Sequence, residues 1–192
     1  MKTLIVQTSP KHTASTLLVN AIHGLIPDLA DKRIVTGKRF APFDTILAIK
    51  IHNTNIDRLR RLFRKFRVIF VCSERTELNL FIDPKYKLYR NVVVFDYTEL
   101  NATEATPLPA VVDTIYSKLA PLLPHIRLDK ALCLQRLVAM NKRYEEIKQK
   151  PFSYIDPFFE LHGSHRNRPA AQSGHKGSVR LLSLNMMTPS FM

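Results

Sequence analysis

The first twenty residues constrain the fold more than any other stretch, because they predict a strand, a tight loop and the start of a helix. Leu4, Ile5 and Val6 form a short apolar run rich in β-branched residues, which is typical of a buried strand. Residues 8–14 are small and polar, and apolar residues recur at helical spacing from Ser15 onward. A loop placed this way presents unpaired backbone N–H groups at the positive end of a helix, so we expect an anion site there.

The side chains of this loop strengthen that expectation. Lys11 and His12 supply charge, and Thr13, Ser15 and Thr16 supply hydroxyl donors. We interpret the stretch as a phosphate cradle. The alternative is an ordinary strand-to-helix turn in which Ser15 or Thr16 caps the helix. The standard P-loop string G-x-x-x-x-G-K-[ST] does not occur in the chain.

Length and composition indicate a globular protein. The 192 residues suit one compact domain, which we place at residues 1–168, followed by a flexible basic tail at 169–192 that is rich in Ser, Gly and Pro. Cys72 and Cys133 lie in apolar surroundings and no signal peptide is recognisable, so we expect reduced thiols and a cytoplasmic location. No stretch approaches the roughly 20 apolar residues of a membrane span.

The chain is strongly basic, with 29 Lys and Arg against 16 Asp and Glu and a formal net charge of +13. Such a surface favours polyanions, whether nucleic acid, phosphorylated nucleotides or sulfated glycans. Much of the charge is crowded between Arg58 and Arg67, on a predicted helix that Asn53 or Thr54 could cap. This charge is either a solvated face or a binding surface. The opposite side of this helix is predicted to be an apolar stripe of Ile56, Leu59, Leu62, Phe63 and Phe66.

Further strands are expected at 33–36, 44–51, 68–72 and 92–95. Helices are expected at 109–119 and from a cap at Asp129 to about residue 150, with Leu132, Leu134, Leu137, Val138 and Ile147 on the apolar side. This alternation predicts an α/β protein, a three-layer sandwich around a mostly parallel sheet of four to five strands. Ligands of such sheets gather at the C-terminal edge. Three turns should reach that edge, at residues 8–15, 50–53 and 73–77.

These three turns, in this order, resemble those of the nucleotide-dependent sulfotransferases. Those enzymes have a P-loop-like fold and use the sulfate donor 3′-phosphoadenosine 5′-phosphosulfate (PAPS). Their first loop reads P-K-S-G-T-T-W or P-x-[KR]-[ST]-G-[ST]-T, and Ala14 stands here in place of the glycine. The resemblance implies that the backbone N–H groups of residues 12–16, with Lys11 or His12, hold the 5′-phosphosulfate. The matching residues are Pro10, Lys11, His12, Thr13, Ala14, Ser15 and Thr16.

The second turn is similar to the family's K-T-H-L-P, which precedes a leucine-rich helix and a K-V-x-x-V strand. This chain has K-I-H-N at residues 50–53, then LRRLFRKF and the strand R-V-I-F-V. The resemblance implies that His52 is the catalytic base, acting together with Lys11 and His12. Imidazole suits this role because its unperturbed pKa of about 6.5 lets it accept a proton near neutral pH. The alternative is a strand-end histidine that is merely hydrogen-bonded.

The third turn is similar to the family's V-x-R-N-P-x-D, although Ser73 stands at the arginine position and Arg75 lies two residues later. The resemblance implies that Arg75, with Ser73 and Arg166, holds the 3′-phosphate. The alternative is an Arg75–Glu pair on a solvated loop. Residues 158–167 are similar to a late F-x-R-K-G loop, and Gly163 carries that match with Arg166. Without the resemblance, the histidines at 162 and 165 with Arg166 are an anion or metal candidate, and we predict no metal because H-x-x-H lacks further ligands.

The resemblance implies transfer of a sulfuryl group from PAPS to an unknown hydroxyl or amine acceptor. Only residues 78–91 lie where the family has a long substrate-binding section, so a catalytically degenerate relative is an alternative. Two other functions stay open. One is a non-catalytic basic protein of the same fold that binds nucleic acid or an acidic partner through the Arg58–Arg67 helix. The other is a nucleoside or nucleotide kinase, against which the absent Walker pair counts.

Overall fold

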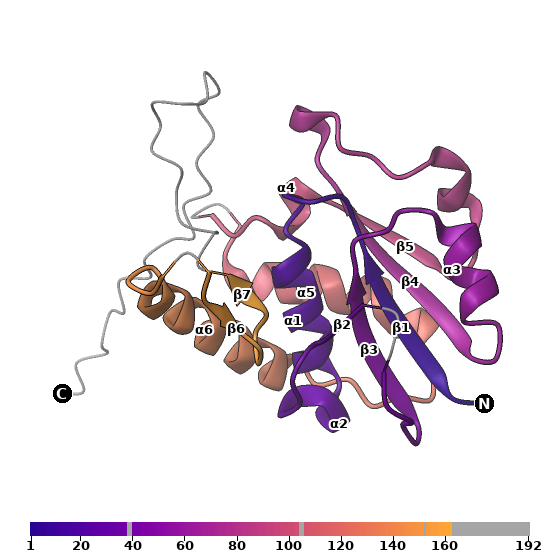
Figure 1. Ribbon diagram of the computed structural model, residues 1–192, viewed down its shortest axis with the longest axis horizontal. Coiled ribbons are helices and arrows are strands. Elements are labelled where there is room, and N and C mark those ends of the chain that lie inside the picture. The colour runs from indigo at the N-terminus through magenta and orange to yellow at the C-terminus, as the bar shows by residue number, and fades with distance from the viewer. Residues whose placement is uncertain (38–39, 104–105, 152, 163–192) are drawn as a thin grey trace.

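A parallel β-sheet forms the centre of the protein. The computed structural model describes residues 1–37, 40–103, 106–151 and 153–162. Five strands lie in the order β2-β3-β1-β4-β5, and every neighbouring pair is parallel (Figure 1). The predicted α/β architecture is therefore confirmed. The strands are β1 (Thr3–Thr8), β2 (Val35–Thr36), β3 (Ile46–Ile51), β4 (Arg67–Glu74) and β5 (Val92–Asp96).

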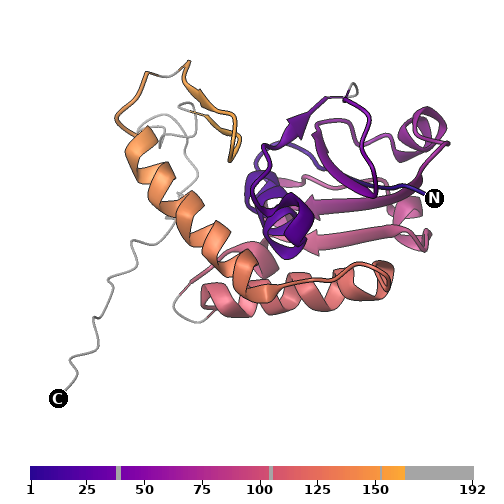
Figure 2. The ribbon, with the colours of Figure 1, turned by 90° about the horizontal axis from the view of Figure 1, so that it is seen from below.

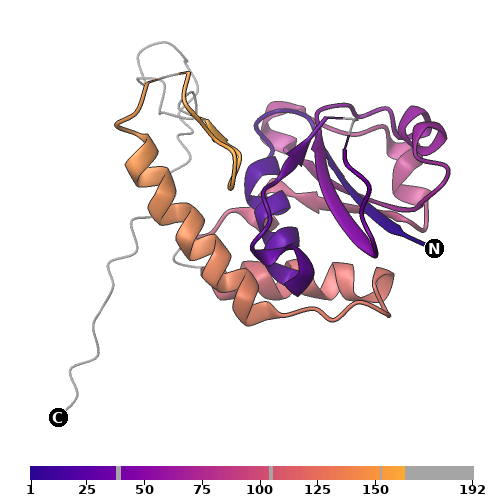
Figure 3. The ribbon, with the colours of Figure 1, turned by 60° about the horizontal axis from the view of Figure 1, so that its bottom comes forward.

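Both faces of the sheet are covered, which explains why the middles of the long strands are apolar. All six residues of β1 are buried, and its side chains alternate between two cores. Ile5 packs against the helices of one face, whereas Leu4 and Val6 pack against those of the other. Figures 2 and 3 show the resulting layers, with α5 on one side of the sheet and α3 on the other.

The helices divide unequally between the two faces. The first face carries α1 (Ser15–Leu25), α2 (Pro27–Ala30), α5 (Leu108–Leu119) and α6 (Lys130–Ile147). The second face carries α3 (Ile56–Leu62) and the short helix η2 (Pro84–Leu88). The remaining short elements are η1 (Thr76–Leu78), α4 (Tyr97–Leu100), η3 (Ala120–Leu122), β6 (Ile155–Asp156) and β7 (Leu161–His162). The last two strands form an antiparallel hairpin beside α6.

The connections that leave β1 and its two neighbouring strands run to opposite faces of the sheet. The chain leaves β1 for α1 on the first face, whereas it leaves both neighbouring strands, β3 and β4, for the second face. Adjacent strands whose connections run to opposite faces leave space between the loops, and open α/β sheets bind ligands there. The sheet order therefore marks the ends of β1, β3 and β4 as the candidate site.

Helix boundaries correct several sequence predictions. Asn55, and not Asn53 or Thr54, caps α3, because its side chain accepts the Arg58 N–H at 2.9 Å. The predicted apolar stripe of α3 is wrong at Leu62, which is 51% exposed. Val138 is likewise exposed on α6, but the predicted cap of that helix at Asp129 is confirmed.

No helix within the described ranges is long and apolar enough to cross a membrane.

Helices α1 and α6 pack closely against each other in the first face. A Cβ built on Gly24 would lie 2.6 Å from the Cα of Cys133 and 3.1 Å from the Cβ of Arg136. These are backbone and near-backbone atoms, so they cannot give way as the end of a flexible side chain could. The absence of a side chain at Gly24 therefore sets the spacing of the two helices.

We expect Gly24→Ala to lower the free energy of unfolding by about 1–3 kcal/mol, because the added methyl group forces α1 and α6 apart. Urea denaturation followed by circular dichroism measures the change. Ser117→Ala on the exposed side of α5 is the control and should change stability by less than about 0.5 kcal/mol. Equal stability of the Gly24 variant and wild type would contradict the packing described.

Candidate functional site

The three predicted turns meet at one edge of the sheet, and Ser9 joins two of them. Its hydroxyl oxygen accepts the Ser73 N–H at 2.8 Å and the Ser73 hydroxyl at 2.9 Å. The Ser73 hydroxyl also lies 2.9 Å from that of Thr13, which donates to the Pro10 carbonyl. All three hydroxyl side chains are buried. The hydrogen bonds among these three hydroxyl groups therefore hold the loop after β1 against the end of β4.

The loop itself has an unusual backbone. His12 and Ala14 have φ values of 68° and 60°, in the left-handed region that a non-glycine residue adopts at a cost of about 1–2 kcal/mol. Ala14 is the N-cap of α1, and no side chain caps this helix. The predicted alternative, a Ser15 or Thr16 cap, is therefore wrong. The first turn of α1 presents its N–H groups at the loop, as an anion-binding terminus does.

Lys11 and His12 are exposed on the outside of this loop, and Pro10 is half-buried between them and the Ser9 network. Neither side chain has an ion pair in the part of the chain that the structure describes. Both are thus available to an anion that approaches the end of α1.

His52 follows the last residue of β3 and lies beside the same loop. Its Nδ1 is 3.4 Å from the Ser9 carbonyl oxygen. A carbonyl can only accept, so the proton of a neutral ring resides on Nδ1 and leaves Nε2 as the basic nitrogen. Partial burial of the ring, together with the nearby charge of Lys50, lowers the pKa of His52 below its ordinary value. The ring is therefore neutral and able to accept a proton at pH 7.

Arg75 connects the third turn to the first. Its guanidinium stacks on the Tyr97 ring, with the Cζ atom 4.0 Å from the ring centroid, and Nη1 donates to the His12 carbonyl at 3.5 Å. Nε donates to the Glu77 carboxylate at 3.2 Å, as the alternative reading of this loop proposed. The Arg75 side chain is only 14% exposed whereas that of Glu77 is 55% exposed. The stacking holds the guanidinium beside the β1–α1 loop, and the Glu77 pair occupies one edge of it.

A buried ion pair lies next to His52. Lys50 occupies the last inward position of β3, where its ammonium group donates to the Thr16 hydroxyl at 3.0 Å and to the Glu160 carboxylate. The side chains of Lys50 and Glu160 are 3% and 11% exposed. Burial lowers the pKa of Lys50, and the Glu160 carboxylate opposes this shift. Burial alone would raise the pKa of Glu160, but Lys50 and a hydrogen bond with His162 hold it below its ordinary value.

Glu160 belongs to the turn that joins β6 to β7, and this hairpin is fixed to the first face. The Phe159 carbonyl accepts the Asn20 side-chain amide at 2.9 Å, and the Phe158 carbonyl accepts Arg136 Nη2 at 2.9 Å. Arg143 and Asp156 form an ion pair of 2.7 Å at the start of the hairpin. These contacts place Glu160, whose own φ is 53°, over the end of β3.

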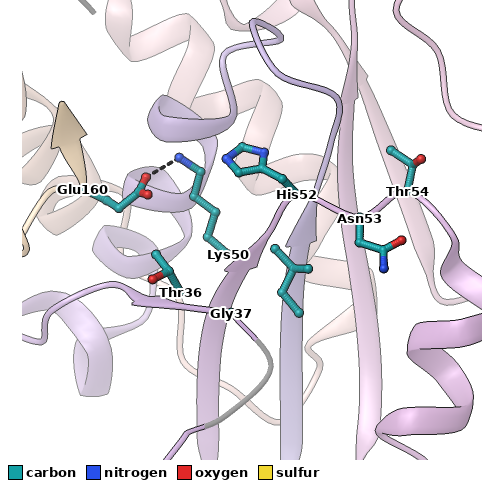
Figure 4. Close-up of a pocket in the computed structure, with 8 residues that line it drawn as sticks. Thr36, Gly37, Lys50, His52, Asn53, Thr54 and Glu160 are labelled. Atoms are coloured by element: carbon teal, nitrogen blue, oxygen red, sulfur yellow. Dashed lines mark hydrogen bonds and ion pairs between the residues drawn. The ribbon is translucent and has the colours of Figure 1, made fainter. Parts of the chain in front are cut away.

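These groups line a cavity of about 580 Å³ at the C-terminal ends of β2 and β3. Figure 4 shows Lys50 and His52 directed toward Glu160. Apart from Ile51 and Gly37, the lining is made of polar side chains. The cavity wall consists of Thr36, Gly37, Lys50, Ile51, His52, Asn53, Thr54 and Glu160.

The structure thus brings the predicted residues 10–16, His52, Ser73 and Arg75 together at one edge of the sheet. Gly163 and Arg166 lie outside the described residues, as do the predicted tail and the second histidine of H-x-x-H. Within the described ranges, no cluster of three or more His, Cys, Asp or Glu side chains could hold a metal ion.

Three residues of the site carried no role in the sequence prediction, namely Ser9, Lys50 and Glu160. The sequence did contain a signal for Lys50. It lies on the same side of an apolar strand as Ile46 and Ala48, so its ammonium group had to be buried with a counter-charge. Glu160 lies 110 residues away and had no such signal. Ser9 resembles any loop serine in the sequence.

A scan against protein-family models finds none that matches the chain, and a search of curated proteins likewise finds no match.

The left-handed conformation of Ala14 leads to a prediction about strain. We expect Ala14→Gly to raise the free energy of unfolding by up to about 1 kcal/mol, because glycine adopts this conformation without steric cost. The same change at the exposed helical residue Ala139 should instead lower it by about 1 kcal/mol. Chemical denaturation of both variants gives the comparison. A loss of stability in both would contradict the backbone described.

The buried pair leads to a second prediction. We expect Glu160→Gln to destabilise the protein by about 3–5 kcal/mol at pH 7, because Lys50 is left buried without its counter-charge. The Glu160 pKa is lowered on folding, so its contribution is present above the ordinary value near 4.5 and is lost as the pH falls through the folded value. The difference from wild type should therefore shrink below pH 4.5.

The control for this experiment is Glu146→Gln. Glu146 is 48% exposed and pairs with Arg143 three residues earlier, so its loss should cost less than about 1 kcal/mol. Denaturation curves between pH 3 and pH 7 distinguish the two carboxylates. An equally small effect at both positions would show that the Lys50–Glu160 pair contributes no net stability.

Proposed function

We propose that the protein is a small sulfotransferase-like enzyme that transfers a sulfuryl group from PAPS to a hydroxyl or amine acceptor. The observation that carries the proposal is the meeting of an uncapped helix N-terminus, a neutral histidine and a stacked arginine at one edge of a parallel sheet. An anion-binding terminus alone would suit many nucleotides. The adjacent base and the second cationic group, Arg75, favour a donor with two separate phosphate groups.

The donor would lie across the β1–α1 loop. The N–H groups at the start of α1 would hold the 5′-phosphosulfate, with Lys11 and His12 on the outside and Lys50 on the inside. Arg75 would receive the 3′-phosphate bidentately after exchange of its Glu77 contact. The buried Ser73 and Thr13 hydroxyls would fix the loop, while the Thr16 hydroxyl links α1 to Lys50.

In the reaction, the acceptor oxygen or nitrogen forms a bond to sulfur, and the bond from sulfur to the bridging phosphate oxygen breaks. The nucleotide leaves as the 3′,5′-bisphosphate. The acceptor proton passes to His52 Nε2, which is unprotonated because Nδ1 faces the Ser9 carbonyl. Fixed N–H donors and Lys50 would stabilise the charge that develops on the departing phosphate. The cavity beside His52 would receive the acceptor.

The first test concerns the ligand class. Thermal unfolding is measured with 3′-phosphoadenosine 5′-phosphate, and separately with ATP and magnesium. At about 100 times the dissociation constant, the bisphosphate should stabilise the protein by about 2.7 kcal/mol. Stabilisation by ATP and magnesium alone would favour a kinase and overturn the proposal. Bisphosphate binding without turnover would support the donor site and identify the protein as a catalytically degenerate relative.

We expect His52→Ala to reduce sulfuryl transfer by about 10²–10⁴-fold while bisphosphate binding is retained, because only the proton acceptor is lost. Transfer from radiolabelled PAPS to simple alcohols, amines and sugars measures the rate. In the wild type, kcat/KM should fall with acid only below pH 6.5, since the His52 pKa is lowered and its neutral form persists to lower pH. His125→Ala, at an exposed histidine before α6, is the control. Unchanged turnover in the His52 variant would refute the assigned role.

A further inference from the structure

The second face of the sheet carries a concentration of basic side chains that the proposed reaction does not use. Arg58, Arg61, Arg64 and Lys65 are exposed along α3 and the turn that follows it. We call these four residues the α3 basic face. None of them forms an ion pair with a carboxylate in the described part of the chain. The face therefore retains its full charge toward solvent.

The acidic group nearest in sequence to this face is already neutralised. Asp57 pairs with Lys85 at 3.3 Å and accepts the Tyr89 hydroxyl at 3.1 Å. The neighbouring Arg60 stacks on the Tyr89 ring, with its Cζ atom 4.8 Å from the ring centroid. Because Lys85 and Tyr89 already engage Asp57, the single carboxylate of α3 does not pair with the arginines of this face.

Most of the apolar and aromatic side chains of α3 and the turn after it face the core, which argues against a lipid bilayer and a single-stranded nucleic acid as partners of the α3 basic face. Ile56, Leu59 and Phe63 are at most 3% exposed in the second core, so α3 has no continuous apolar face to enter a lipid bilayer. The aromatic side chains among these residues are also turned inward: Phe63 is buried, and Phe66 packs with Phe40 and Phe43. A single-stranded nucleic acid, which requires exposed rings on which bases stack, would find none on this face.

The composition of the face also argues against a protein partner. Protein interfaces have apolar centres depleted of charge, whereas here Leu62 is the only large apolar side chain that α3 exposes. A ligand with regularly repeated negative charges can form an ion pair with each of the four unpaired cations, so it complements this face better than a protein surface does. Three of the four are arginines, whose planar guanidinium groups match phosphate oxygens bidentately.

We propose that the α3 basic face binds double-stranded nucleic acid through its phosphate backbone, without reading the base sequence. Arg58 and Arg61 lie about one turn apart on α3, at about 1.5 Å per residue, and Arg64 and Lys65 follow in the next turn of the chain, so the four cations extend over a length on the order of 10 Å. A duplex carries one charge per about 1.7 Å of its axis, which offers several phosphates over that length. Binding releases condensed counterions and therefore weakens with salt. This proposal does not depend on the sulfotransferase reaction.

Fluorescence anisotropy of a labelled mixed-sequence DNA duplex with the full chain tests the proposal. Each phosphate contact contributes about 0.9 to the slope of log K against log salt concentration. The triple variant Arg58→Ala, Arg61→Ala, Arg64→Ala should reduce that slope by about 3 and weaken binding by more than about tenfold at low salt. A scrambled duplex of the same length should bind equally.

The matched control removes the same three charges elsewhere, through Arg127→Ala, Lys142→Ala and Lys150→Ala around α6. These side chains are exposed and lie on other elements. Retained duplex binding in the control supports the proposal, and equal loss in both triple variants overturns it as a general charge effect. No duplex binding at low salt also overturns it, as does preference for sulfated glycan or for phosphatidylserine vesicles. Circular dichroism shows whether each variant remains folded.

Discussion

The hydrogen bonds around Ser9 determine where the candidate site forms. One hydroxyl oxygen accepts the Ser73 N–H and hydroxyl, so the loop that leaves β1 is held over the end of β4. Without this junction, the left-handed residues in the loop would lack the surrounding contacts that maintain a strained backbone. The N–H groups of α1, the base at His52 and the stacked Arg75 all depend on that loop position. A small, entirely buried polar network thus fixes an exposed surface.

The Lys50–Glu160 pair likewise joins two parts of the chain, the end of β3 and the C-terminal hairpin, which are far apart in the sequence. A lysine at an inward position of a central strand is costly to bury, and only a fixed carboxylate makes it tolerable. The hairpin that supplies Glu160 is in turn tied to α1 and α6 by Asn20 and Arg136. The position of the Lys50 charge beside His52 therefore depends on contacts made by α1, α6 and the hairpin together. This arrangement gives the cavity a cation whose position does not depend on solvent-exposed loops.

The sequence predicted the elements whose signals are local. Strands rich in β-branched residues and the cap at Asp129 were readable because neighbouring residues determine them. The cap of α3 was not, because Asn53, Thr54 and Asn55 all suit a cap and the turn after β3 selects among them. Convergence of the three turns followed from the topology of a parallel sheet, since its strands end at one edge. The pairing of Lys50 with Glu160 crosses 110 residues, and no local pattern encodes such a contact.

The long separation of this pair bears on how the protein is made. Chains emerge from the ribosome N-terminus first, and the strands of the sheet are complete by residue 96, well before Glu160 is synthesised. During that interval the ammonium group at the end of β3 has no carboxylate to meet and stays hydrated. The buried environment of Lys50 is therefore complete only when the hairpin that carries Glu160 is present. A charge inside the central sheet thus depends on the part of the described chain that is synthesised last.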